Sequence, residues 1–286
     1  MQYGLKNLNL KSNYFQTTKF MALAYTITGT GDTVLLVHGF CESKEMWETF
    51  VEPLSQKYRV IAIDLPGFGK SRMNFKQPSM SDLARSVAET LNLLKVQKFV
   101  FIGHSLGGYI GLEFASQNPH KLKGLGLFHS SAFADTEEKK ANRTKSVEFI
   151  REHGSEQYVK NLFGDLFSEA NKSSLSETIE RLTEKAMEIE PEYIARALVA
   201  MRERQDYTEI LSNMACPVLL IAGEDDSAVP LEMSEKQSTL PKKPTSHILP
   251  NVGHMGMFEA PTETLKMIED FAELCFKEKG TTWDKE

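Results

Sequence analysis

A serine lies between glycines in the motif Gly-His-Ser-Leu-Gly at residues 103–107. A β-rich run, Phe99–Ile102, ends directly before the motif, and a helical apolar pattern, Leu106–Gln117, starts within it. A strand–turn–helix connection of this kind is so sharp that a side chain at either glycine would collide with its neighbour. The pattern predicts that Ser105 is held in a strained conformation with its hydroxyl above the strand ends, as a nucleophile requires.

A serine hydroxyl is a weak nucleophile at neutral pH, so it needs a base within hydrogen-bond reach and a carboxylate that orients that base. His254 is the candidate base. Of the seven histidines it alone follows the last β-rich run, Ser246–Leu249, and precedes the final helical pattern. Another histidine, His129, also follows a β-rich run and could approach the site, although a structural role is the favoured interpretation.

Three carboxylates compete for the role of the acid. They follow the run Val218–Ala222 and the glycine after it, at Glu224, Asp225 and Asp226. Asp226 is the expected acid because it lies three residues after that glycine. Asp225 stays an alternative, Glu224 is expected to be structural, and Asp135 is a more remote candidate.

These residues need a scaffold that brings distant strand ends together, and the hydrophobic pattern predicts one. Four β-rich runs alternate with helical patterns in the first half of the chain, which is typical of a parallel sheet covered on both faces. The runs are 34–37, 60–63, 99–102 and 125–128, and the helical patterns are 81–95 and 106–117. Residues 20–29 are expected to form an antiparallel strand that leads in, and 262–279 a final helix.

The pattern changes between residues 132 and 213, where no β-rich run occurs. Amphipathic patterns at 148–153, 177–190 and 192–203 predict helices instead. The chain is therefore divided into a first core part, 1–131, a helical cap, 132–213, and a second core part, 214–286.

Composition excludes several classes of protein. The 286 residues carry a net charge of −6 without a basic stretch, which argues against a nucleic-acid partner. The wholly apolar runs are far shorter than the ~20 residues of a membrane span, so no membrane insertion is expected. Three scattered cysteines and a first fifteen residues without an apolar core favour a cytoplasmic protein. The histidine and cysteine spacings typical of zinc sites are absent, so no metal is expected. The chemistry of a serine, a histidine and a carboxylate implies no organic cofactor either.

The order Ser105, Asp226, His254 resembles that of the α/β-hydrolase fold. Three further segments are similar to the family's patterns: 34–40, Val-Leu-Leu-Val-His-Gly-Phe; 64–71, Asp-Leu-Pro-Gly-Phe-Gly-Lys-Ser; and 253–261, which contains Gly-His and Glu-Ala-Pro. The resemblance implies a mostly parallel eight-stranded sheet with helices on both faces and an inserted helical cap. It also implies an oxyanion hole formed by the backbone N–H groups of Phe40 and Leu106.

The resemblance further implies a serine hydrolase without a cofactor that acts on a small carboxylic ester or lactone through an acyl-enzyme. A ligand-binding or signalling protein with slow turnover, a thioesterase or acyltransferase, and a carbon–carbon bond hydrolase stay open as alternatives. The protein is expected to be a monomer or a homodimer. Apolar residues expected to line the substrate pocket are Trp47, Phe128, Phe163, Phe167, Met201 and Met255.

Overall fold

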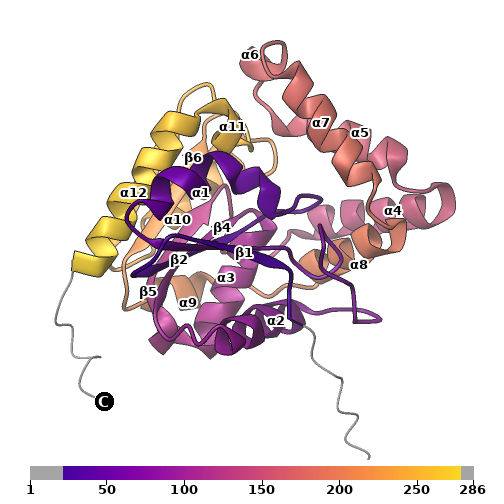
Figure 1. Ribbon diagram of the computed structural model, residues 1–286. Coiled ribbons are helices and arrows are strands. Elements are labelled where there is room, and N and C mark those ends of the chain that lie inside the picture. Colours follow the sequence, from indigo (N-terminus) through magenta and orange to yellow (C-terminus); the bar gives the residue numbers. More distant parts are fainter. Residues whose placement is uncertain (1–21, 278–286) are drawn as a thin grey trace, which may run out of the picture.

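A seven-stranded sheet runs through the centre of the computed structural model, which describes residues 22–277 (Figure 1). The strand order is β1-β3-β2-β4-β5-β6-β7, and every neighbouring pair is parallel except β1 with β3. The central strands β2, β4 and β6 are buried along their whole length, as a parallel sheet covered on both faces requires. The bounds are β1 Tyr25–Thr28, β2 Thr33–Val37, β3 Arg59–Ile63, β4 Phe99–His104, β5 Leu122–Phe128, β6 Val218–Gly223 and β7 Pro244–Leu249.

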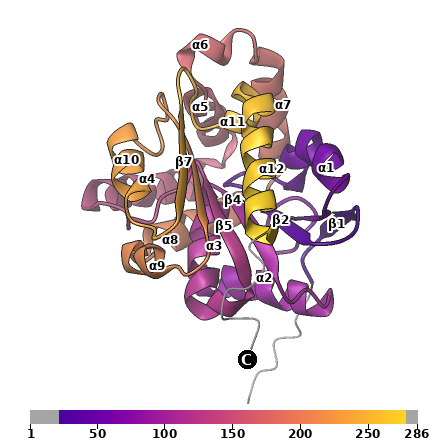
Figure 2. The same cartoon turned by 90° about the vertical axis from the view of Figure 1, so that its left-hand side faces the viewer.

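Helices pack on both faces of the sheet (Figure 2). Successive residues of β5 show this, because side chains alternate between the faces of a strand. Gly124 faces Phe271 of α12, whereas Leu125 faces Gly111 of α3. The helix α1 packs with α12, and both α2 and α9 pack against α3. The bounds are α1 Glu48–Ser55, α2 Met80–Leu93, α3 Leu106–Gln117, α9 Thr208–Asn213, α10 Leu231–Ser238, α11 Gly256–Glu259 and α12 Pro261–Lys277, with 3-10 turns at Lys44–Trp47 and Pro119–Lys121.

The chain between β5 and β6 is helical. Its helices are α4 Glu137–His153, α5 Glu156–Leu166, α6 Glu169–Lys172, α7 Ser176–Met187, α8 Pro191–Arg202 and α9. In this segment α4 packs on α8 and α5 packs on α7, and Figure 1 shows these four helices together, away from the sheet. The helix α9 instead contacts α3, so the last helix of the segment lies with the sheet layer.

Helix α4 starts at Glu137, whereas the apolar pattern predicted a helix only from Glu148. The difference has a local cause. The buried residues of α4 are Val147 and Ile150, so its first half has no apolar stripe for a periodicity argument to detect. The start is set instead by Thr136, whose hydroxyl accepts a hydrogen bond from the Lys139 N–H and so caps the helix.

The sheet has seven strands in the described residues rather than the expected eight. The hydrophobic pattern contains seven β-rich runs, and the eighth strand was implied by family resemblance alone. Three parts of the sequence predictions fall outside the described range: residues 20–21 of the expected first strand, residues 278–279 of the expected last helix, and the first fifteen residues, which lack an apolar core. Within that range no helix is both long and apolar enough to cross a membrane, and the three cysteines form no disulfide.

Candidate active site

The turn between β4 and α3 holds Ser105 in a strained backbone conformation. Its φ of 48° and ψ of −112° lie outside the regions that L-residues ordinarily adopt. A Cβ on Gly103 would lie 2.4 Å from the carbonyl of Gly107. A Cβ on Gly107 would lie 2.5 Å from the carbonyl oxygen that ends β2. Glycine is therefore required on both sides of the serine.

Hydrogen bonds from the end of β5 hold this turn in place. The Ser105 N–H donates to the Phe128 carbonyl at 2.9 Å. The Ser130 hydroxyl donates to the Ser105 carbonyl at 2.7 Å. Gly108 makes room for this hydroxyl, because a Cβ there would lie 2.3 Å from the Ser130 Oγ. Ser105 itself is half-buried, so its side chain keeps access to solvent.

His254 lies on the loop after β7, and backbone hydrogen bonds fix that loop. The His254 N–H donates to the Leu166 carbonyl at 2.7 Å, which ties the loop to the end of α5. One oxygen of Glu259 accepts hydrogen bonds from the N–H groups of Gly253 and Met255 at 3.0 and 3.1 Å. The loop that carries the imidazole is therefore held on one side by α5 and on the other by the carboxylate at the end of α11.

The buried carboxylate of Asp226 pairs with His254. The His254 Nδ1–H donates to Asp226, with 2.8 Å to Oδ2 and 2.9 Å to Oδ1. Oδ1 also accepts the N–H groups of Ala228 and Val229, each at 2.8 Å. Burial opposes ionisation of Asp226, but His254 and His129 outweigh it and hold the pKa of this carboxyl well below its usual range. Asp226 is thus an anion that fixes the tautomer of His254.

The competing acids lie elsewhere. Asp225 accepts a hydrogen bond from the Ser168 hydroxyl at 2.6 Å, so its carboxylate joins the loop after β6 to the start of α6. Asp135 forms a buried ion pair with Arg143 at 2.5 Å. Glu224 is exposed. Of the four carboxylates considered from the sequence, the structure places Asp226 against His254.

A second histidine shares Asp226. His129 Nδ1 lies 3.1 Å from Asp226 Oδ2, and its buried Nε2 has no hydrogen-bond partner within residues 22–277. Its φ of 48° is a further strained position, and Gly256 gives its ring space, because a Cβ there would lie 2.4 Å from Nε2. Burial outweighs the attraction of Asp226 and lowers the pKa of His129 to about 4. His129 is therefore a neutral donor to the carboxylate at neutral pH.

His104, at the end of β4, links the loop after β2 to the loop that carries His254. Its Nδ1 lies 3.0 Å from Oε2 of the buried Glu42, and its Nε2 lies 3.0 Å from the carbonyl oxygen of His254. Both partners accept, so both ring nitrogens carry protons and the ring is an imidazolium. Burial opposes this charge, but Glu42 prevails and raises the pKa of His104. The same Glu42 oxygen accepts the Gly39 N–H at 2.6 Å.

The loop after β2 presents a free backbone donor. The His38 Nδ1–H donates to the Gly39 carbonyl at 2.7 Å, and its Nε2 accepts the Leu65 N–H at 2.8 Å, which fixes the loop from below. The N–H of Phe40 has no acceptor among the described residues. The N–H of Leu106 opens α3, where a helix leaves its first donors without internal partners. These are the two donors expected at the oxyanion hole.

Helix α5 contacts both sides of the site. The rings of Tyr158 and Phe40 meet edge to face with 6.4 Å between centroids. The carbonyl of Leu166 holds the base loop, and the ring of Phe167 lies 6.5 Å from that of Phe258, just beyond it. The helical segment therefore covers the loops that carry the candidate base and oxyanion donors.

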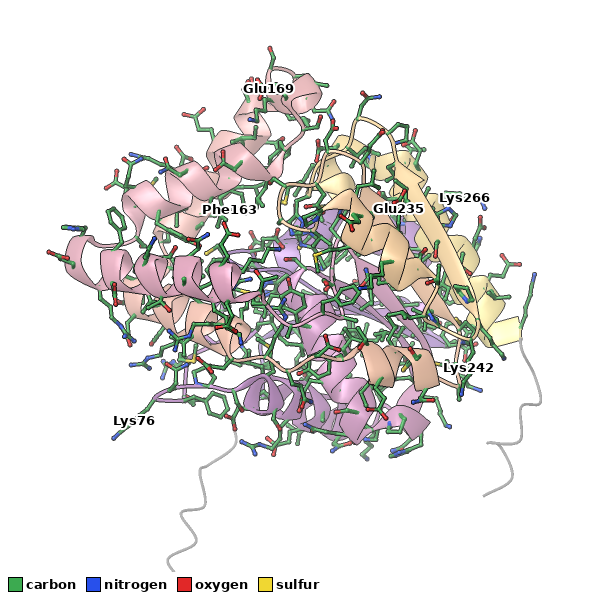
Figure 3. The ribbon with its side chains drawn as sticks, turned by 180° about the vertical axis from the view of Figure 1, so that it is seen from behind. Lys76, Phe163, Glu169, Glu235, Lys242 and Lys266 are labelled. Atoms are coloured by element: carbon green, nitrogen blue, oxygen red, sulfur yellow. The ribbon has the colours of Figure 1, made fainter. Side chains whose placement is uncertain are left out.

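The six residues expected to line the substrate pocket are all buried. Trp47 packs against Phe128 beneath the site, with 5.9 Å between ring centroids. Phe163 faces inward from α5 (Figure 3), and Met201 accepts a weak hydrogen bond from Arg143 through its sulfur. Contact of these side chains with substrate stays a prediction.

Three buried side chains, His129, Asp226 and His254, are spaced as a metal site would need. One ring nitrogen of each histidine and a carboxylate oxygen lie within 4.8 Å of one another. Both imidazoles instead turn a nitrogen toward the carboxylate at hydrogen-bond distance. The geometry therefore fits a hydrogen-bonded acid–base set. An acid–base set of this kind and a serine on a strained turn are the components that nucleophilic acyl transfer requires.

A profile of the α/β-hydrolase fold matches residues 32–261. The chain belongs to the α/β-hydrolase fold family. This confirms the family and the fold class inferred from the sequence motifs, and several of the related proteins are named as hydrolases.

Three related proteins illustrate this family. The chain is 29% identical to an uncharacterized hydrolase, YugF, of Bacillus subtilis, over 84% of this chain and 89% of the relative. It is 28% identical to the 2-hydroxy-6-oxo-6-(2'-aminophenyl)hexa-2,4-dienoic acid hydrolase of Metapseudomonas resinovorans, over 87% and 84% of the two chains. A solved thermophilic esterase from Thermogutta terrifontis superposes with a TM-score of 0.84 at 32% identity, covering 88% of this chain and 93% of that one.

Sequence reasoning did not assign Glu42 and His104 to the site, and it favoured a structural role for His129 although this residue could approach the site. A signal for the two histidines was present. His104 ends β4 and His129 follows β5, and the carboxyl ends of adjacent parallel strands meet at one edge of the sheet.

Replacing the acid should separate Asp226 from its neighbour. We expect Asp226→Asn to lower kcat/KM for p-nitrophenyl acetate by at least ~10³-fold, because the amide cannot stabilise the imidazolium or select the tautomer. Asp225→Asn is the matched control and should cost less than ~10-fold. Steady-state kinetics of both variants measure this, and the reverse ranking would assign the acid to Asp225.

The shared histidine predicts a pH effect on stability. An unfolded histidine takes up a proton near pH 6.5, whereas folded His129 stays neutral down to about pH 4. The unfolded chain therefore binds more protons in this window, and the free energy of unfolding falls as the pH decreases. His129→Asn, which keeps a donor and tolerates a positive φ, should remove a slope of up to about 1.4 kcal/mol per pH unit.

Urea unfolding at several pH values between 4 and 6.5 measures these slopes. The exposed His153 provides the control, and His153→Asn should leave the slope of the wild type unchanged. Equal slopes for wild type and His129→Asn would show that His129 is protonated in the folded state across this window.

Proposed function

We propose that the protein is a serine hydrolase that cleaves a small carboxylic ester or lactone through an acyl-enzyme on Ser105. The observation that carries this proposal is the buried pair of His254 and Asp226, at 2.8 Å, on the same sheet edge as the strained turn of Ser105. His104 supports it, because this residue directly precedes Ser105 and its ring contacts the His254 backbone. The ring centroids of His104 and His254 lie 5.0 Å apart.

In the proposed mechanism His254 takes the proton of the Ser105 hydroxyl while the oxygen attacks the substrate carbonyl carbon. The N–H groups of Phe40 and Leu106 stabilise the oxyanion, a role in which a single donor is typically worth ~3–4 kcal/mol. The C–O bond to the alcohol breaks, and His254 returns the proton to the leaving oxygen. Water, deprotonated by His254, then attacks the acyl-enzyme, which releases the carboxylic acid and the free serine. Asp226 stabilises the imidazolium in both halves.

The proposed ester or lactone specificity is supported by the likeness to the thermophilic esterase at 32% identity. A second candidate is hydrolysis of a carbon–carbon bond. It is favoured by two relatives, at 28% and 27% identity, whose names describe hydrolases of 2-hydroxy-6-oxo dienoic acids. A serine with a neighbouring histidine serves either chemistry, so the choice between them depends on the substrate.

Two arginines of the segment between β5 and β6, Arg202 and Arg204, are already paired with acidic side chains. Arg204 lies 2.7 Å from Asp135 and 4.1 Å from the ring centroid of Tyr109, and it donates to two backbone carbonyls. Arg202 is paired with Glu203 at 2.7 Å. This arrangement supports a neutral substrate over a dicarboxylate, and hence the ester or lactone proposal. A cytoplasmic monomer or homodimer remains the expected form of the enzyme.

A panel of substrates tests the proposal. It contains p-nitrophenyl acetate, butyrate and octanoate, a γ-lactone and 2-hydroxy-6-oxohexa-2,4-dienoate, each measured with wild type and Ser105→Ala. We expect the wild type to hydrolyse a short ester or the lactone with the highest kcat/KM. Ser105→Ala should lose at least ~10³-fold, because the nucleophile is removed while the fold is kept.

Three results would contradict the proposal in different ways. Rates for both proteins that do not exceed the uncatalysed background would favour a ligand-binding protein. Highest efficiency with the dienoate would make the protein a carbon–carbon bond hydrolase. Activity retained by Ser105→Ala, with unchanged circular dichroism, would move the nucleophile to another residue.

A further inference from the structure

A cavity of about 530 Å³ lies at the edge of the sheet opposite to Ser105. It is lined where β4, β5 and β6 begin, by residues such as Lys98, Leu122 and Pro217, and by the ends of α3, α9 and α12. Ser105 follows the other end of β4, so about seven residues of extended chain, or roughly 20 Å, separate it from Lys98. Figure 2 shows α9 and the end of α12 at the side of the molecule away from α6.

The floor of this cavity is apolar. Ala115, Leu122, Met214 and Cys275 line it and are each less than 9% exposed in the folded chain. Its volume is in the range of sites that bind small organic molecules, roughly 300–1,000 Å³. The cavity therefore offers space and dispersion contacts to an apolar ligand body.

The lining is also basic, although the net charge of the whole chain is −6. It contains Lys98, Lys123, Lys242 and His120 but no Asp or Glu, although the protein carries 39 acidic and 33 basic side chains. Lys98 and Lys242 form no ion pair with a described residue. Figure 3 shows Lys242 at the surface, well away from Glu169 of α6. A concave site lined by charges of one sign concentrates ions of the other sign.

The helix ends at the cavity do not cancel this charge. The helices α3, α9 and α12 all end there, and each helix C-terminus carries at most about half a negative charge. Together they amount to at most about −1.5, whereas Lys98 and Lys242 alone contribute two full positive charges. The net field at the mouth therefore favours an anion.

We propose that this cavity is a second ligand-binding site, separate from the site of Ser105, for a small amphipathic anion with an apolar chain and a carboxylate head. The chain would occupy the floor at Leu122 and Met214, and the carboxylate would lie between Lys98 and Lys242 at the mouth. The site does not depend on the proposed hydrolase activity, because no residue of the acid–base set lines it.

Three probes of equal chain length test the proposal by isothermal titration calorimetry: octanoate, 1-octanol and octylammonium. Wild type should bind octanoate at least ~10-fold more tightly than 1-octanol and should bind octylammonium most weakly. The double variant Lys98→Ala/Lys242→Ala should lose at least ~10-fold in octanoate affinity. The matched control, Lys76→Ala/Lys145→Ala, removes two exposed lysines elsewhere, changes the net charge equally and should bind as wild type.

A variant that fills the cavity locates the site. Ala215 is exposed at the mouth, so Ala215→Trp should weaken octanoate and 1-octanol alike without unfolding the chain, as circular dichroism would confirm. The proposal would be overturned if Lys98→Ala/Lys242→Ala and Ala215→Trp both bound octanoate as tightly as wild type. The probe would then bind elsewhere on the protein. Equal affinity of wild type for octanoate and 1-octanol would overturn recognition of the anion. Ester hydrolysis, measured separately, should be unaffected in these variants.

Discussion

One tight turn determines the arrangement of the site. Ser105 is held at a φ of 48° between β4 and α3, and glycines at 103, 107 and 108 make the close backbone approaches possible. The cost of such strain is of order 1–3 kcal/mol, and the hydrogen bonds from the end of β5 offset it. The turn places the serine above the sheet edge and leaves the N–H of Leu106 free at the start of a helix.

The histidines convert this turn into a connected site. The His104 imidazolium neutralises the buried carboxylate of Glu42. Its other ring nitrogen donates to the backbone carbonyl of His254 and so holds the loop of the base. Asp226 is stabilised by two imidazoles and two backbone N–H groups, so it stays ionised despite burial. The loops after β2, β4, β5, β6 and β7 thus meet in one hydrogen-bonded network, which holds together residues that lie 150 positions apart in the chain.

Sequence reasoning predicted what short-range patterns encode. The seven β-rich runs, the turn at Ser105 and the choice of Asp226 rest on local spacing. The structure contains the runs and the turn and places Asp226 beside His254, whereas the role of Asp226 as the acid stays a prediction. The first half of α4 was missed because a capping Thr136 defines it rather than an apolar stripe. The pairing of His104 with Glu42 was also missed, since 62 residues separate them and only the packing of β2 beside β4 brings them together.

The most direct test of the central claim is covalent labelling with a fluorophosphonate, which reacts with an activated serine hydroxyl. After labelling of the full chain, proteolysis and mass spectrometry should find the phosphonyl adduct on the peptide that contains Ser105. The adduct should form much more slowly in a His254→Ala variant, because the serine then lacks its base. An adduct on a different residue, or equal labelling rates in wild type and His254→Ala, would contradict the account of an activated serine at this turn.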